Sequence, residues 1–163
     1  MTLIPIFQKE LEKESVISRK MLERVPSDKL DWQPHPKSMT LGQLAAHVAE
    51  LPSWIEMALH TDELDFEKNA YTPLLPASTA DILDYFQTSL DRGRKALQED
   101  DGSQLEKEWV LRAGSEVLNR YTKAEVIRMA LNQITHHRAQ LGVYLRLLDI
   151  PIPGSYGPSA DER

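Results

Sequence analysis

Residues 122–148 have the sequence TKAEVIRMALNQITHHRAQLGVYLRLL, and this stretch decides the fold class. It begins with the pattern of a capping box, in which the hydroxyl of Thr122 caps a helix and Glu125 reaches back. Pro151 and Pro153 end it, because proline cannot continue the helical hydrogen bonds. With about 100° of rotation per residue, its apolar residues share one face: Val126, Ala130, Ile134, Leu141, Tyr144, Leu145 and Leu148. The stretch therefore predicts a long helix with one side in a core.

Three further segments show the same helical periodicity. The first covers residues 4–25, the second begins with a capping box at Thr40, and the third covers residues 78–97. Pro52 should bend or divide the second helix. Four helices with one apolar stripe each most economically share a core, so residues 1–163 are expected to form a single all-α four-helix bundle. The inward positions of the three segments are expected to be Phe7, Leu11, Ile17, Met21, Leu22, Leu41, Leu44, Val48, Leu51, Ile55, Ile82, Phe86, Leu90 and Leu97.

Two connections are longer than a minimal bundle requires. Residues 26–39 contain three prolines and Trp32. In residues 103–121, two apolar runs flank Ala113-Gly114, which is a pattern for a short β-hairpin. Long connections permit parallel as well as antiparallel neighbouring helices.

The composition excludes several classes of function. The net charge is −6, and the 19 basic residues are scattered among 25 acidic ones, which disfavours a nucleic-acid partner. No apolar run approaches the roughly 20 residues that cross a bilayer, and the charged N-terminal region is unlike a secretory signal. The absence of cysteine excludes disulfides and thiolate nucleophiles. We therefore expect a cytoplasmic protein with no membrane or nucleic-acid partner.

Two histidines on different helices are candidate metal ligands. His137 lies near the middle of the inward face of the last helix, with Gln133 one turn earlier, and His47 lies at the edge of the stripe on the second helix. Helix bundles commonly hold metals between side chains of facing helices, and neutral imidazole is a strong ligand for zinc, nickel or iron. A buried polar network without metal fits the same pattern, so the residues alone leave both interpretations open. His136 is expected on the flank of its helix, about 100° from His137.

The remaining histidines and catalytic motifs offer less. His35 is expected in a rigid loop between two prolines, and His60 near the last carbonyls of a helix. Metalloprotease, phosphate-loop and serine-hydrolase motifs are absent from the sequence. Glu50 places a carboxylate one turn from His47.

The chain resembles the DinB/YfiT-like superfamily of metalloenzymes over nearly its whole length. The resemblance rests on Trp32-Gln33-Pro34, on LGQLAAH at 41–47, on NQITHHRAQL at 132–141 and on the tail from Leu145 to Glu162. It implies an up-down-down-up four-helix bundle with two long connections, usually a homodimer, that holds nickel, zinc or a similar divalent ion by three histidines.

The resemblance also identifies the positions of the metal ligands. One corresponds to His47, and a His-x-x-x-His pair corresponds to positions 133 and 137. Here the first of the pair is Gln133, whose carbonyl oxygen is a weaker ligand than imidazole for such an ion. We therefore expect a weakened site of His47, His137 and an auxiliary Gln133, which His136 or Glu50 could supplement.

Relatives in this superfamily include low-molecular-weight-thiol transferases and a thiol-dependent isomerase. The resemblance therefore implies a metal-dependent enzyme of one of two kinds: an S-transferase, in which a small thiol cosubstrate attacks an electrophile, or a hydrolase. Arg138 or Gln140 would hold the environment of the last helix. The alternative function is a non-catalytic, dimeric binding protein whose metal site has decayed.

Overall fold

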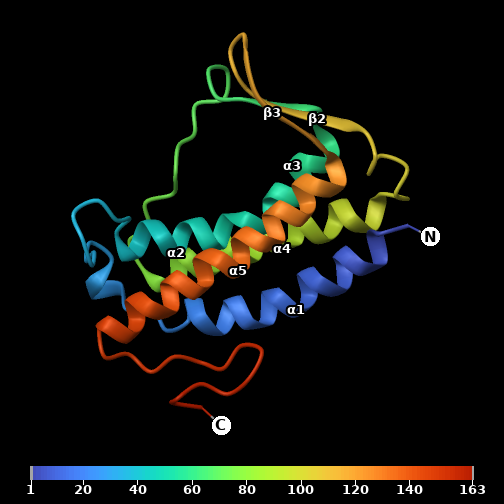
Figure 1. Ribbon diagram of the computed structural model, residues 1–163. Helices are drawn as coiled ribbons and strands as arrows, with labels where there is room; N and C mark the ends of the chain where they lie inside the picture. The colour runs from blue at the N-terminus through green and yellow to red at the C-terminus, as the bar shows by residue number, and fades with distance from the viewer. Residues whose placement is uncertain (1, 163) are drawn as a thin grey trace.

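The computed structural model describes residues 2–162, in which five α-helices and two short 3₁₀ segments are joined by a small β-sheet (Figure 1). The α-helices are α1 (Ile4–Leu22), α2 (Leu41–Glu50), α3 (Trp54–His60), α4 (Thr79–Glu99) and α5 (Lys123–Leu147). The 3₁₀ segments are η1 (Ser27–Lys29) and η2 (Leu51–Ser53). The strands are β1 (Glu63–Asp65), β2 (Glu108–Ala113) and β3 (Glu116–Thr122).

The second bundle helix is divided, as Pro52 predicts. Pro52 lies in η2, between α2 and α3, because its ring removes a backbone N–H and strains the preceding turn. Both α1 and α2 pack against α4 and α5. Figure 1 shows that α1 and α5 run in one direction and that α2–α3 and α4 run in the other. The capping boxes at Thr40 and Thr122 are both formed.

Helix α4 passes very close to the break in the second helix. Gly93 of α4 lies against the backbone carbonyl of Pro52, and a Cβ at this position would overlap with that oxygen. Glycine is therefore the residue that permits this close approach.

The prediction of an all-α fold is wrong, because the structure contains a three-stranded mixed sheet in the order β1-β2-β3. The hairpin expected within residues 103–121 is present as the antiparallel pair β2–β3. The strand that the sequence did not indicate is β1, which pairs parallel to β2 with Leu64 opposite Leu111. It has only three residues, too few to show an alternating pattern, and its partner lies far along the chain.

The carboxylate of Asp65 ties β1 to the turn of the hairpin. Gly114 opens this turn with a positive φ of 55°, a conformation that suits glycine. The Oδ1 atom of Asp65 accepts N–H bonds from Gly114 (2.9 Å) and Glu67 (3.0 Å). The Gly114 bond in particular lowers the pKa of Asp65, and burial opposes it. The sheet and the loop 66–78 consequently hold together and arch over one side of the bundle (Figure 1).

The core lies between the helices, and every inward position expected for α1, α2–α3 and α4 is buried. Trp109 is a strand residue that is fully buried in this core. The indole of Trp109 on β2 is 1% exposed, and its N–H donates to the Thr61 hydroxyl at 3.0 Å. This bond fixes the sheet to the end of α3. Along residues 2–162, no helix is long and apolar enough to cross a membrane.

Candidate metal centre

The structure brings the imidazoles of His47 and His137 together. Their ring centroids lie 4.5 Å apart, and the ring planes are inclined by 73°. His47 comes from α2 and His137 from α5, two helices that pack directly against each other. The His47 side chain is 15% exposed, and His137 is half-buried. The convergence that helical spacing allowed is therefore present.

Each of the two imidazoles is held through its Nδ1 atom by a residue three positions later. His47 Nδ1 lies 2.6 Å from Oε1 of Glu50, and His137 Nδ1 lies 2.7 Å from Oε1 of Gln140. Because a carboxylate oxygen and an amide oxygen both accept, the neutral form of each imidazole donates from Nδ1 and keeps the lone pair on Nε2. Histidines that bind metals usually have this arrangement, with the second ring nitrogen anchored by a carboxylate or carbonyl.

The carboxylate that holds His47 has two further donors. Glu50 is 5% exposed, its Oε1 accepts from the Tyr71 hydroxyl at 2.7 Å, and its Oε2 accepts from the Tyr85 hydroxyl at 3.4 Å. Burial and the neighbouring Glu50 carboxylate raise the pKa of both tyrosines. Both hydroxyls therefore keep their protons near neutral pH and act as donors.

The environment of His137 favours neutral imidazole. Burial lowers the pKa of His137, the bond to Gln140 opposes this effect, and the nearby His47 and His136 reinforce it. The indole of Trp54 packs edge-on against His47 at 5.8 Å between centroids. Neutral imidazole is the form that coordinates a metal.

The other proposed ligands contribute less to the centre. Gln133 is half-buried one turn before His137, and no hydrogen bond from its side chain is found among residues 2–162. His136 is exposed on the flank of α5, as its position predicts, with its ring 4.8 Å from that of His137. Glu50 is engaged with Nδ1 of His47 and thus supports this imidazole from behind. In the described part of the chain, no three His, Cys, Asp or Glu side chains converge as a metal site would require.

The donor set therefore consists of two imidazole nitrogens with an amide oxygen nearby. Two imidazoles anchored at Nδ1 fit a borderline divalent ion such as zinc or nickel, which neutral imidazole coordinates. An amide in place of a third imidazole makes the set a weak one.

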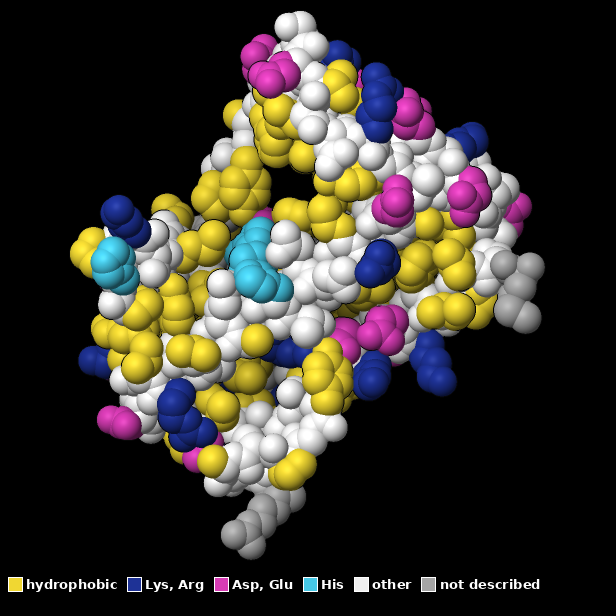
Figure 2. All heavy atoms as spheres, viewed as in Figure 1, with side chains coloured by type: hydrophobic (Ala, Val, Ile, Leu, Met, Phe, Trp, Pro, Cys, Tyr) yellow, Lys and Arg dark blue, Asp and Glu magenta, His cyan; other side chains and the backbone are white. Residues whose placement is uncertain are grey.

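The histidine cluster is accessible from outside. Figure 2 shows histidine side chains at the centre of one face, at the edge of an opening between the bundle and the overhanging hairpin and loop. Hydrophobic side chains surround this opening. Because His136 is exposed and His137 is half-buried, this part of α5 is open to solvent.

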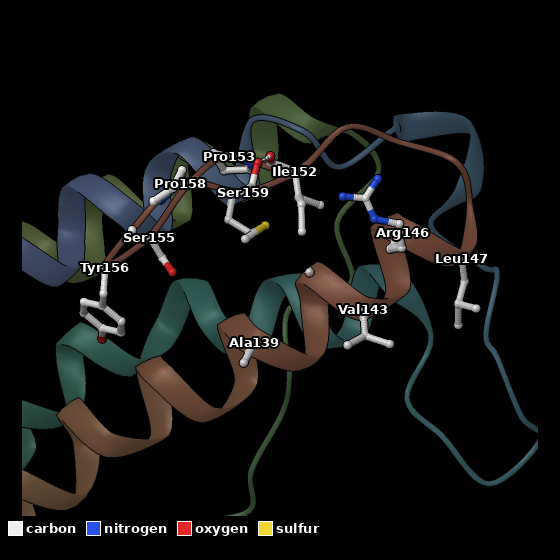
Figure 3. A pocket seen from close by; sticks show the side chains of 14 residues that line it. Ala139, Val143, Arg146, Leu147, Ile152, Pro153, Ser155, Tyr156, Pro158 and Ser159 are labelled. Atoms are coloured by element: carbon white, nitrogen blue, oxygen red, sulfur yellow. Dashed lines mark hydrogen bonds between the residues drawn. The ribbon is translucent and has the colours of Figure 1, made fainter. Parts of the chain in front are cut away.

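A second hollow lies between α5 and the C-terminal segment and has a volume of about 500 Å³ (Figure 3). Its lining is mostly apolar and includes Val143, Ile152 and Tyr156. No histidine lines it, and its one charged lining residue, Arg146, is paired with Asp161. The hollow is therefore separate from the candidate metal centre.

Some residues of the centre had a signal in the sequence, and others had none. Glu50 and Gln140 stand three positions after His47 and His137, in the parallel segments HVAE and HRAQ. Tyr71 comes from a loop, and Tyr85 lies beside the apolar stripe of α4, so no local pattern indicates either residue.

The two remaining histidines lie away from the centre. His35 is in an exposed loop, where its Nδ1 accepts the N–H of Lys37 at 3.1 Å. His60 is the exposed last residue of α3, and the hydroxyl of Thr61 binds the last-turn carbonyl of Met57. Neither histidine contributes to the candidate metal centre.

The fold and the paired histidines define a helical-bundle protein with a candidate divalent-metal centre. A model of the DinB family matches residues 6–162, and the chain belongs to this family. It is 24% identical to the uncharacterised protein YrdA of Bacillus subtilis (strain 168) over 156 residues, which cover 96% of this chain and 89% of YrdA.

Solved structures share the fold. A DinB-like protein from Bacillus cereus ATCC 10987 aligns with a TM-score of 0.72 and 22% identity, over 92% of this chain and 95% of that one. The DinB-like protein YjoA from Bacillus subtilis aligns with a TM-score of 0.68 and 16% identity, over 96% and 98% of the two chains. At these identities the likeness concerns the fold alone.

Proposed function

We propose that His47 and His137 bind a divalent metal ion, with Gln133 as an auxiliary ligand, and that the protein is a metal-dependent thiol S-transferase. The observation that carries the metal site is the convergence of two imidazoles from different helices, each anchored at Nδ1 by an acceptor. The zinc- or nickel-binding character of the site follows from these nitrogen donors.

The residues of the chain prepare this site. Glu50 and Gln140 hold the Nδ1 protons, so both Nε2 atoms are available. The lowered pKa of His137 keeps this imidazole neutral. Trp54 packs on His47 and limits access of water on that side.

The proposed reaction joins a small thiol to an electrophilic carbon. A sulfur–carbon bond forms, the bond to the leaving group breaks, and the leaving group departs with the electron pair and takes up the thiol proton. A bound divalent ion favours the deprotonated form of a thiol or water that it coordinates. The chain has no cysteine, so the thiol must come from a cosubstrate. The thiol specificity rests on the superfamily resemblance, because the geometry alone also suits a hydrolase.

Metal binding and turnover test this function. Elemental analysis of the freshly purified protein, followed by calorimetry with zinc and nickel, should show one ion per chain. Turnover of a low-molecular-weight thiol with a panel of small electrophiles should disappear in His137→Ala and persist in His35→Ala, whose histidine lies in an exposed loop. Unchanged turnover in His137→Ala would exclude the proposed mechanism.

One observation favours a second candidate function. Two imidazoles converge, and no third His, Cys, Asp or Glu side chain of residues 2–162 joins them in a group that could hold a metal ion. A non-catalytic binding protein, in which His47, Gln133 and His137 form a polar network, would have such a site. Its thermal stability would respond neither to chelator nor to added metal. The homodimer implied by the resemblance is tested by light scattering and is compatible with either function.

A further inference from the structure

Glu50 is a buried carboxylate whose only cationic or potentially cationic partner among residues 2–162 is His47. Burying a charge costs free energy unless hydrogen bonds or an opposite charge compensate it. Here the compensation comes from one imidazole N–H and two phenol hydroxyls. A carboxylate held in this way is set up to orient the imidazole.

The strongest two of these bonds meet on one atom. Oε1 of Glu50 accepts from His47 Nδ1 at 2.6 Å and from the Tyr71 hydroxyl at 2.7 Å. Tyr71 belongs to the loop 66–78, which leaves the sheet and arches over the side of the bundle (Figure 1). The loop is thereby connected to the imidazole of His47 through a single carboxylate oxygen.

We propose that Glu50 is a positioning residue for His47, and that Tyr71 couples docking of the loop 66–78 to metal binding at this histidine. The inference rests on the proposed role of His47 as a metal ligand. Coupling between two sites is reciprocal. If the Tyr71 hydroxyl strengthens metal binding, bound metal strengthens the docking of Tyr71 by the same factor.

The exposure of Tyr71 makes this coupling measurable. The residue is 59% exposed, so its contact with Glu50 can be removed without a change in the core. Tyr71→Phe deletes only the hydroxyl. Tyr121→Phe is the matched control, because the Tyr121 hydroxyl accepts from Asn119 on β3 and does not contact Glu50.

A first experiment needs no metal. In ¹⁵N-histidine NMR of the metal-free protein, His47 should carry its proton on Nδ1. Glu50→Gln, which keeps an acceptor oxygen, should retain this tautomer, and Glu50→Leu should lose it. His137 is the internal control, because Gln140 holds it in every variant. The same His47 tautomer in the wild type and in Glu50→Leu would overturn the positioning role.

A second experiment measures zinc binding and hydrogen exchange. Loss of a residue behind a ligand typically weakens metal affinity by about 10–100-fold, and we expect this range for Glu50→Leu. Tyr71→Phe should weaken it severalfold, and Tyr121→Phe should leave it unchanged. Zinc should slow amide exchange in residues 66–78 of the wild type and not of Tyr71→Phe.

The outcomes separate this inference from the proposed function. If the wild type binds zinc and both Glu50→Leu and Tyr71→Phe bind it equally well, the inference fails and the metal site stands. If only Tyr71→Phe is unaffected, the coupling to the loop fails. If the wild type binds no zinc, the proposed function and the coupling both fail.

Discussion

Helix α5 carries two adjacent polar residues, His137 and Arg138, that end in very different surroundings. The Arg138 guanidinium donates to Glu14 at 2.5 Å, to Ser18 at 3.2 Å and to the Tyr156 hydroxyl at 3.0 Å. Tyr156 in turn donates to the other oxygen of Glu14 at 2.9 Å. Arg138 and Glu14 are almost completely buried. This cluster is a closed network that fixes the C-terminal segment to α1 and α5.

The cluster around His137 is open. Glu50 and Gln140 engage Nδ1 of the two imidazoles, and no hydrogen bond to either Nε2 is present among the described residues. Buried polar groups whose bonds are all made rigidify a fold, whereas polar groups that converge with free lone pairs beside solvent are suited to a ligand. Adjacent residues of α5 therefore have different roles: Arg138 stabilises the fold, and His137 belongs to the candidate metal centre.

The largest expected effect is a loss of stability when the closed network around Arg138 is broken. Glu14→Gln leaves the Arg138 charge buried and uncompensated, which should lower the free energy of unfolding by about 3–5 kcal/mol. The melting temperature should fall by roughly 6–20 °C for a chain of this size. Calorimetry on the metal-free protein measures both. The control is Glu12→Gln, whose exposed pair with Arg94 should contribute at most about 1 kcal/mol. Zinc affinity should not change in Glu14→Gln, and a parallel loss of affinity would contradict the division of roles.

The second experiment removes an imidazole from the candidate metal centre. His137→Ala removes one of two imidazole ligands and should weaken zinc binding by at least about 100-fold, or about 2.8 kcal/mol. Its stability without metal should fall less than that of Glu14→Gln, because His137 is half-buried. Titration calorimetry and urea unfolding separate the two quantities. His35→Ala should have the same zinc affinity and the same stability as the wild type.

A smaller change in zinc affinity is expected at Gln133, the auxiliary ligand. Gln133→His places a third imidazole one turn before His137, and zinc affinity should rise by about tenfold, or about 1.4 kcal/mol. The result is read by calorimetry at one pH. Equal affinity would show that position 133 does not reach the ion.

The smallest effect concerns pH. Because the pKa of His137 is lowered from its ordinary 6.5, the unfolded chain takes up a proton at a higher pH than the folded protein. The contribution of His137 to stability is therefore complete above about pH 6.5 and is lost as the pH falls through the lower value of the folded state. Urea unfolding of the metal-free protein between about pH 7.5 and 5.5, a range of about one unit on each side of the ordinary His value, should show this slope. His137→Gln should reduce the slope, and an unchanged slope would assign it to other groups.

Helix positions and the two imidazoles could be predicted because their signals are local. Capping boxes, apolar stripes and Pro52 are each recognised within a few residues. The projection of α5 put His137 near the middle of the inner face, whereas the structure has His137 half-buried and Arg138 buried instead. The bundle then has few ways to arrange its helices, so inward residues of neighbouring helices meet.

The remaining features depend on contacts between distant segments. β1 is defined by its pairing with β2, with Leu64 opposite Leu111, and Tyr71 is defined by a bond to Glu50 from a loop. Neither feature has a period or a motif of its own. The bond between Glu50 and His47 Nδ1 has no sequence signal for a similar reason, since spacing puts the carboxylate near His47 without saying which ring nitrogen it contacts.

The close contact between Gly93 and the Pro52 carbonyl fixes the position of α4 along its own axis. A helix that fits a neighbour only where a side chain is missing cannot slide along it by a turn. Tyr85 stands eight residues before Gly93 on the same helix. The contact of Gly93 with the Pro52 carbonyl therefore also sets the distance between the Tyr85 hydroxyl and the Glu50 carboxylate. The absence of a side chain at Gly93 thus helps to position the Tyr85 hydroxyl, which lies about two helical turns away.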